Sequence, residues 1–177
     1  METPRFIFKT TMEKSDYRKF LYFATFIRHK LTLPAVVLIA LAGSVVANQP
    51  TPLANPAALA LTWLLMFCLA VAAVALRVEY ANNRRVATDN TGSFDSLNIL
   101  SFYDDRLVMQ NLSVSGTGTL AYSRFYKLLE TREYFIFYLN ANQASLLRKK
   151  DIPDPQLFGE FIRQRFLGRY NNYSRLF

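Results

Sequence analysis

Few side chains in this sequence could do chemistry. It has one histidine, His29, flanked by Arg28 and Lys30, and one cysteine, Cys68, inside an apolar run. A catalytic or pH-sensing histidine needs an orienting partner and a cleft, and two neighbouring cations disfavour its protonation. We therefore interpret His29 as an anchor at a membrane edge. A lone cysteine supplies neither a disulfide framework nor a cysteine-based metal site.

Two adjacent carboxylates occur at Asp104 and Asp105. They could form an acid pair or half of a metal site, but no other carboxylate or histidine stands at a spacing that completes a ligand set. Aspartate is also favoured in turns between strands, because its side chain accepts hydrogen bonds from the local backbone. We predict a turn at this point, with no catalytic residue, no metal and no cofactor.

A stretch of small residues, NLSVSGTG, contains Ser113, Ser115, Gly116 and Gly118. It superficially suggests a phosphate-binding loop or a serine nucleophile. However, it lacks the Gly-Lys-Ser/Thr of a P-loop and the framing glycines of a nucleophile elbow. The pattern predicts a hairpin turn over residues 115–118.

The most basic run is Arg148, Lys149 and Lys150, and a second basic pair, Arg84 and Arg85, follows the apolar region. If the two groups lie together, they form a cationic patch that attracts anionic lipid headgroups by about 1 kcal/mol per residue, or an acidic protein partner. The alternative is a solvated strand end whose charges keep the strand from pairing with other chains. These five residues are the candidate contact residues.

No Asp, Glu, Lys, Arg or His occurs between Leu31 and Leu76. The stretch contains two apolar segments, residues 31–47 and 57–76, separated by a polar break with prolines. Segments of this length and composition predict two antiparallel membrane-spanning helices. A buried helical hairpin of a soluble protein is one alternative. A cleaved signal peptide is another, but thirty polar residues before the apolar core are too many for one.

The flanks of the apolar region set the expected orientation. Basic residues precede the first segment and follow the second, whereas the break between them is uncharged. The positive-inside rule then places both termini in the cytoplasm. We expect three parts: a cytosolic strand and amphipathic helix (1–30), a transmembrane hairpin (31–80) and a cytosolic domain (81–177).

Alternating and helical patterns predict the elements outside the hairpin. A helix over 15–30 would pack on the cytosolic domain or lie at the membrane interface, with a kink near Pro34 where it meets the first span. A final helix begins with Asp154 and Pro155 as its cap and first residue. The predicted strands cover residues 5–10, 97–102, 107–114, 119–122, 134–139 and 144–148, with 123–130 ambiguous. The fold class is an α+β membrane protein, with a two-helix hairpin and a small antiparallel sheet capped by a C-terminal helix.

The chain carries a net charge of +8, from 21 Lys and Arg against 13 Asp and Glu. The excess is spread evenly over the parts outside the hairpin, and no basic cluster with a stacking motif indicates nucleic-acid binding. We interpret the charge as a cytosolic surface that faces anionic lipid.

Three local patterns resemble the YcxB-like family of bacterial membrane proteins. They are ILSFYDDRL at residues 99–107, the segment from Tyr122 to Glu130 that leads into YFIFYL at 134–139, and ASLLRKK at 144–150 that leads into the helix ending near Phe166. Tyr122 and Phe125 stand where many relatives have Trp. The resemblance implies a bacterial membrane protein with a cytosolic module similar to bacterial pleckstrin-homology-like domains, a bent antiparallel sheet capped by a C-terminal helix. The family has no established biochemical function.

Two functions are compatible with these observations. The first is a non-enzymatic inner-membrane protein that presents its cytosolic domain to a protein partner, a second copy of itself or anionic lipid headgroups. The second is a subunit of a membrane enzyme or transport complex whose site, with His29, Asp104 and Asp105, is completed by another chain.

Overall fold

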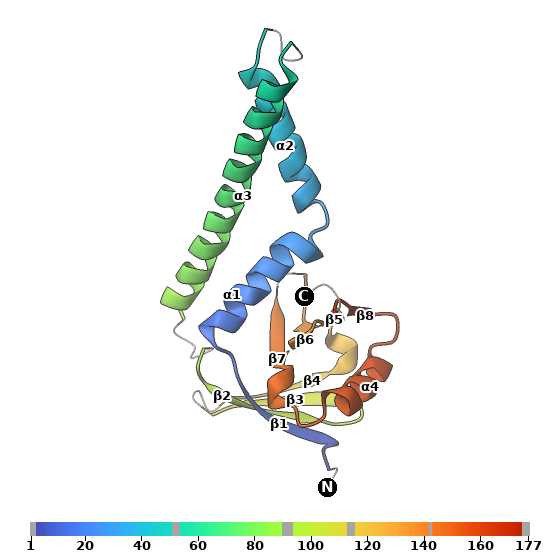
Figure 1. Ribbon diagram of the computed structural model, residues 1–177. Coiled ribbons are helices and arrows are strands. Elements are labelled where there is room, and N and C mark those ends of the chain that lie inside the picture. The colour runs from blue at the N-terminus through green and yellow to red at the C-terminus, as the bar shows by residue number, and fades with distance from the viewer. Residues whose placement is uncertain (1–2, 51–53, 90–93, 113–115, 142, 175–177) are drawn as a thin grey trace. The chain divides into compact units, whose positions relative to one another are not determined.

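The computed structural model describes residues 3–50, 54–89, 94–112, 116–141 and 143–174. The chain forms two compact units (Figure 1). Unit 1 consists of Met1–Glu13 and Asn90–Phe177, and unit 2 is Lys14–Asp89. The first strand thus belongs to the same unit as the C-terminal part, and the helix after it belongs to the same unit as the apolar region.

Unit 2 is helical. It contains α1 (Lys14–Phe23), a π-helical segment η1 (Ala24–Arg28), α2 (Thr32–Ala47) and α3 (Pro56–Ala87). Within the described residues, α3 is the one helix long and apolar enough to cross a membrane, with a mean hydropathy of 2.5 over 18 residues. The segment Lys14–Arg28 and α2 pass the same test only as a pair, and they are bent by 70° at the break between them. The predicted kink is therefore confirmed, just before the predicted position.

The two apolar helices of unit 2 pack side by side (Figure 1). Gly43 of α2 faces α3, where a Cβ would lie at an ordinary van der Waals distance, 3.6 Å, from the side chain of Met66. Near the far end of the pair, the amide of Asn48 donates to the Thr62 hydroxyl at 2.7 Å. Asn55 caps α3 by accepting a hydrogen bond from the backbone N–H of Ala58 at 3.1 Å, as its position before Pro56 predicts.

The carboxylate of Glu79 connects the polar end of α3 to helix α1. Glu79 accepts hydrogen bonds from Arg18 and from the Tyr22 hydroxyl, both at 2.7 Å. Glu79 follows the apolar part of α3, so this contact lies where the helix becomes polar. It fixes α1 across the end of the helical pair.

Unit 1 contains two four-stranded sheets. The first has the order β1-β2-β3-β4 and is antiparallel throughout. The second has the order β7-β6-β5-β8; β5, β6 and β7 are antiparallel, and β8 runs parallel to β5. The strands are β1 (Phe6–Thr11), β2 (Leu97–Phe102), β3 (Arg106–Asn111), β4 (Gly116–Ala121), β5 (Lys127–Glu130), β6 (Tyr134–Tyr138), β7 (Ala144–Arg148) and β8 (Tyr170–Asn172).

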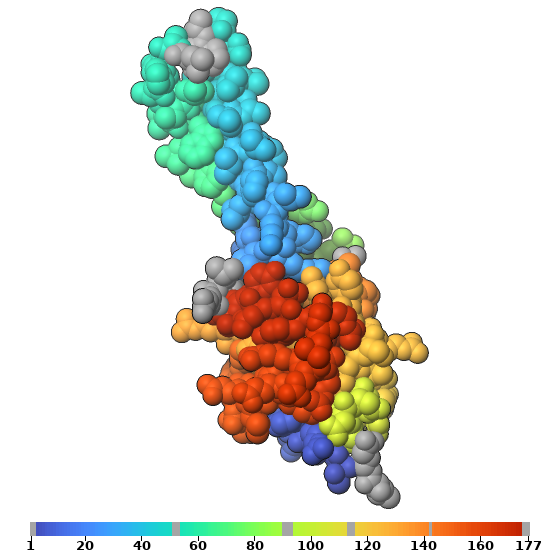
Figure 2. Space-filling view, turned by 90° about the vertical axis from the view of Figure 1, so that its right-hand side faces the viewer, coloured from blue at the N-terminus to red at the C-terminus, as the bar shows by residue number. Residues whose placement is uncertain are grey.

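Helix α4 (Pro155–Arg165) contributes the centre of the aromatic core. Asp154 caps it by accepting from the backbone N–H groups of Gln156 and Leu157. Phe158 is fully buried, and its ring meets those of Phe8, Phe102 and Phe135 edge-on at 4.8 to 5.2 Å. Figure 2 shows the C-terminal part of the chain, in orange and red, covering one side of unit 1. One side chain of α4 therefore joins both sheets.

Two details differ from the sequence-based expectation. Gly116 and Gly118 were predicted in a turn, but they lie in β4 opposite Asn111 and Met109 of β3. Strand pairing overrides the low strand propensity of glycine here. Strand β8 was not predicted at all. Residues 113–115 lie outside the described residues, so the end of the predicted strand 107–114 and the role of Ser113 and Ser115 are not described.

Replacing Phe158 with Ala is expected to lower the free energy of unfolding by about 3–5 kcal/mol, because it removes a ring on which both sheets pack. The matched control is Leu157→Ala on the same helix, whose side chain is 54% exposed and whose loss should cost less than about 1 kcal/mol. Chemical unfolding of the full chain in detergent measures both. Equal destabilisation by the two variants would contradict a core centred on Phe158.

Candidate functional site

Arg148 of β7, one of the predicted contact residues, is buried. Its guanidinium donates to Asp151 at 2.7 Å and to Glu13 at 2.6 Å, and it also reaches the Thr11 hydroxyl at 2.7 Å. Asp151 in turn accepts from the Thr10 hydroxyl at 2.6 Å. The network joins the end of β1 to the end of β7. Arg148 therefore holds the two sheets together at this corner.

Lys149 pairs with a different carboxylate, that of Glu130 of β5, which is buried. The Lys149 ammonium lies 2.7 Å from Glu130 Oε1, while Oε2 accepts from Arg163 at 3.0 Å and from the Tyr170 hydroxyl at 2.6 Å. Burial raises the pKa of Glu130, but hydrogen bonds and charges from Lys149, Tyr170 and Arg163 outweigh it, so the pKa lies below its ordinary value. Burial and the bond to Glu130 raise the pKa of Tyr170 to about 12. This cluster connects β5, β8 and α4.

The remaining predicted contact residues are exposed. Lys150 has a side chain that is 63% exposed and lies 3.2 Å from Glu13. Arg84 and Arg85 are exposed in the last turn of α3. Because α3 belongs to unit 2 and Lys150 to unit 1, a single patch of all five remains a prediction. Arg148 and Lys149 form ion pairs within unit 1, which a run of basic residues in a sequence does not reveal.

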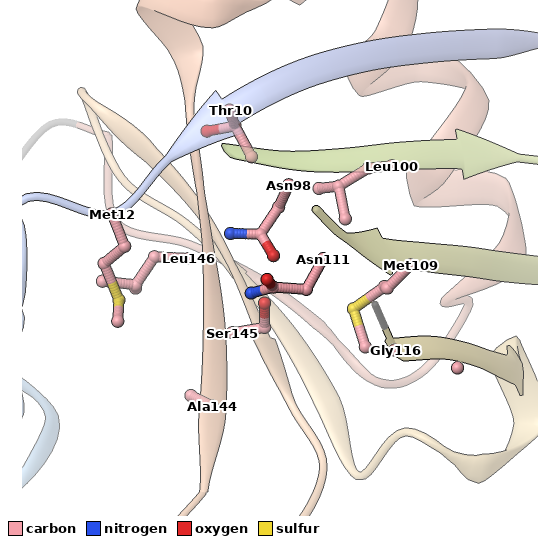
Figure 3. A pocket seen from close by; sticks show the side chains of 11 residues that line it. Thr10, Met12, Asn98, Leu100, Met109, Asn111, Gly116, Ala144, Ser145 and Leu146 are labelled. Carbon is pink, nitrogen blue, oxygen red and sulfur yellow. The ribbon is translucent and has the colours of Figure 1, made fainter. Parts of the chain in front are cut away.

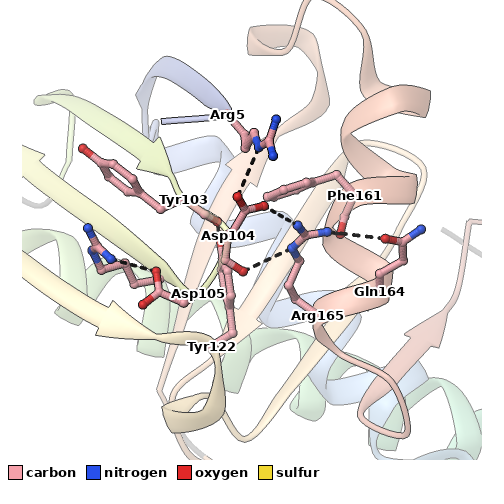
Figure 4. Close-up of polar contacts among 9 residues, drawn as sticks. Arg5, Tyr103, Asp104, Asp105, Tyr122, Phe161, Gln164 and Arg165 are labelled. Carbon is pink, nitrogen blue, oxygen red and sulfur yellow. Dashed lines mark hydrogen bonds and ion pairs between the residues drawn. The ribbon is translucent and has the colours of Figure 1, made fainter. Parts of the chain in front are cut away.

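Asp104 lies in the turn between β2 and β3, as predicted, and joins three elements (Figure 4). It accepts from Arg5 at 3.2 Å and from Arg165 at 2.7 Å, and Arg165 also lies 3.7 Å from the Phe161 ring centroid. The Arg5 guanidinium, with Arg165, holds the pKa of Asp104 below its ordinary value. Asp105 pairs instead with Arg106 at 2.8 Å. A hollow of about 340 Å³ beside Asp104 is lined by polar and apolar side chains of β1 and α4.

His29 lies at the break between η1 and α2. It lines a hollow of about 490 Å³ with its basic neighbours Arg28 and Lys30, and none of the residues described there is a carboxylate. Cys68 is exposed on α3. Among the described residues, no group of three or more His, Cys, Asp or Glu side chains could hold a metal ion.

A further hollow, of about 300 Å³ and partly polar, lies at one end of the space between the sheets (Figure 3). Its floor is the end of the first sheet, where Thr10, Asn98 and Asn111 are neighbours in register. Ser145 of β7 faces them from the second sheet. The amide groups of Asn98 and Asn111 donate to Ser96, which is buried, at 3.2 and 3.1 Å.

The sequence does not predict this site. Its patterns place Asn98 and Asn111 in strands without indicating a role, and Gly116 and Gly118 in a turn. The alternation within each strand is the one local signal: it places Asn98 on the face of Leu100, and Asn111 on the face of Met109. Their alignment depends on the register between strands, which one sequence does not specify.

Unit 1 is thus an α+β unit in which the helix α4 packs against both sheets, and partly polar hollows lie at its surface. Comparison with protein families adds one match: residues 102–164 fit the family described as YcxB-like protein. The match runs from the end of β2 almost to the end of α4 and confirms the resemblance. Neither the curated proteins nor the solved structures contain a match.

Replacing Glu130 with Gln is expected to lower the free energy of unfolding at pH 7 by about 2 kcal/mol, the scale of hydrogen bonds to charged groups. A carboxylate with a depressed pKa stabilises the fold above its ordinary pKa of about 4.3, and this stabilisation is lost as the pH falls through the lower, folded-state pKa.

The unfolding free energy of the unmodified chain should therefore fall more steeply in acid than that of Glu130→Gln. Glu160→Gln, an exposed position on α4, is the control and should leave the pH dependence unchanged. Parallel pH profiles for the unmodified chain and Glu130→Gln would show that Glu130 does not have a depressed pKa.

Proposed function

We propose that this chain is a non-enzymatic protein of the bacterial cytoplasmic membrane whose unit 1 acts as a binding module at the cytoplasmic surface. The observation that carries the proposal is helix α3. It runs without interruption from an apolar window long enough to cross a bilayer into a polar end with Arg84 and Arg85. A helix of 32 residues spans about 48 Å, more than a hydrocarbon core of about 30 Å. Its basic end would therefore reach the headgroups.

The proposal includes α2 as a second span. Residues 31–47 carry no charge, and α2 packs along α3 within unit 2. With 16 residues, α2 covers about 24 Å, so it would need local thinning of the bilayer or polar ends at the interface. Basic residues precede α2 and follow α3, whereas the break between the two helices is uncharged; this asymmetry favours termini in the cytoplasm.

A pleckstrin-homology-like fold for unit 1 is supported by its element order. A four-stranded antiparallel meander is followed by a three-stranded one and then by a helix that packs between them. In this interpretation unit 2 is an insertion between the first two strands. The family resemblance implies the same fold.

The proposed ligands of the exposed cations are anionic lipid headgroups, contacted by Arg84 and Arg85 in unit 2 and by Lys150 in unit 1. These three cations are exposed, whereas Arg148 is paired with Asp151 and Lys149 with the buried Glu130. Asp104 and Asp105 are each paired with arginine side chains. That pairing favours a binding protein over the alternative, an enzyme or transport subunit that would use these carboxylates.

Labelling of single cysteines tests the membrane topology. In a Cys68→Ser background, Thr88→Cys and Gln143→Cys are expected to react with a membrane-impermeant maleimide from the cytoplasmic side. Gln49→Cys, in the break between α2 and α3, should react only from the opposite side. Reaction of all three from one side would refute the hairpin topology.

Charge reversal tests the lipid contact. The variant Arg84→Glu, Arg85→Glu, Lys150→Glu should retain less phosphatidylglycerol, because each basic residue near the surface contributes about 1 kcal/mol. The measurement is native mass spectrometry of the full chain released from nanodiscs that contain phosphatidylglycerol and phosphatidylcholine.

The matched control reverses three other exposed cations, Lys9, Arg124 and Arg132, and changes the net charge equally. Equal loss of bound phosphatidylglycerol in both variants would indicate a general charge effect and contradict contact by the three named residues.

A further inference from the structure

The inner face of the first sheet changes character along its strands. One row of paired residues, Phe6, Phe102, Leu107 and Leu120, is apolar and packs into the core. The next row is Phe8, Leu100, Met109 and Gly118, and the last is Thr10, Asn98, Asn111 and Gly116. The core therefore ends in a step from apolar to polar side chains, and β4 contributes only glycine to the last two rows.

The two glycines leave the hollow open. A Cβ built at Gly116 or at Gly118 meets no atom within 4 Å, and neither has a positive φ. A larger side chain could therefore occupy the space without a clash or backbone strain. The missing side chains account for a hollow of about 300 Å³ at a point where the core would otherwise continue.

The lining determines the kind of molecule that fits. None of the described residues that line the hollow is ionisable, and an ion without a partner in such a place would lose much of its hydration energy. Leu100 and Met109 offer an apolar contact one row in from the mouth. Because two residues of a strand rise about 6.6 Å, that contact suits an aliphatic chain of a few carbons.

The mouth of the hollow is lined by uncharged hydrogen-bonding groups. The amide nitrogens of Asn98 and Asn111 each donate one hydrogen bond to Ser96, and both side chains line the hollow together with the Ser145 hydroxyl (Figure 3). An amide group accepts through its oxygen and donates through its nitrogen, and a hydroxyl does both. A matching group is an uncharged amide or alcohol, which also donates and accepts.

We propose that this hollow is a binding site for a small uncharged amide or alcohol with a short aliphatic chain. The chain lies against Leu100 and Met109, and the polar end bonds to Asn98, Asn111 and Ser145. This site is independent of the proposed lipid contacts, because it contains no basic residue.

The test uses the full chain in nanodiscs and three probes with the same chain: hexanamide, hexanoate and hexylammonium. Titration is followed by the side-chain amide NMR signals of Asn98 and Asn111. We expect saturable shifts with hexanamide, and affinities at least tenfold weaker for the two ions. Equal or tighter binding of either ion, or no saturable shift with hexanamide, would overturn the proposal.

Variants locate the binding. Gly118→Val should fill the hollow and weaken hexanamide binding at least tenfold, whereas Thr119→Val, on the exposed face of the same strand, should leave it unchanged. Ser145→Ala removes a hydroxyl with little change of volume and should weaken binding several-fold. Thermal unfolding checks that each variant is folded. Unchanged hexanamide binding by folded Gly118→Val and Ser145→Ala would place the probe elsewhere.

Discussion

Unit 1 depends on the pairing of β1 with β2. The two strands pair along their whole length, from Phe6 opposite Phe102 to Thr11 opposite Leu97, although all of unit 2 lies between them in the sequence. The same strand brings Phe8 to Phe158 and places Thr10 and Thr11 beside Asp151 and Arg148. Without β1, the first sheet would lose one side of its aromatic core, and Arg148 would lose its contacts to Thr11 and Glu13. The edge of β2 would also be left unpaired, and an unpaired edge invites association with other chains.

Many charged side chains of unit 1 form ion pairs that stabilise the fold. Glu130 accepts from three donors: Lys149, which directly follows β7, and one residue each of α4 and β8. Arg148 donates to Asp151, Glu13 and Thr11. Buried charges of this kind are tolerated because their partners replace water, and they penalise arrangements in which the partners are separated. Arg148 belongs to one of these clusters, and its neighbour Lys149 belongs to the other. Neighbouring residues of one basic run thus point to different carboxylates, and only Lys150 remains at the surface.

Local signals in the sequence predict most helices and strands, but they do not predict which strands pair with one another. Asn55 with Pro56 and Asp154 with Pro155 mark helix starts by backbone chemistry alone, and the strands at 97–102, 134–139 and 144–148 follow from alternation and β-branched or aromatic content. Strand β8 is only three residues long and polar, so it has no period to detect; its position follows from pairing with β5. Gly116 and Gly118 favour turns locally, and only β3 makes them a strand. The site residues Asn98, Asn111 and Ser145 meet through register and sheet packing, which are long-range properties.

The insertion of unit 2 between β1 and β2 sets an order of events during folding. Closing a loop of about 85 residues costs about 3 kcal/mol more than closing a tight hairpin, and β2 is synthesised only after both apolar helices. Strand β1 must therefore remain unpaired while unit 2 is made, with Phe6, Ile7 and Phe8 unprotected. Arg5 and Lys9 frame these residues, and charges that flank an apolar strand oppose its aggregation. Both side chains are exposed in the folded unit. Their charges can therefore oppose aggregation of the unpaired strand without being buried once unit 1 has folded.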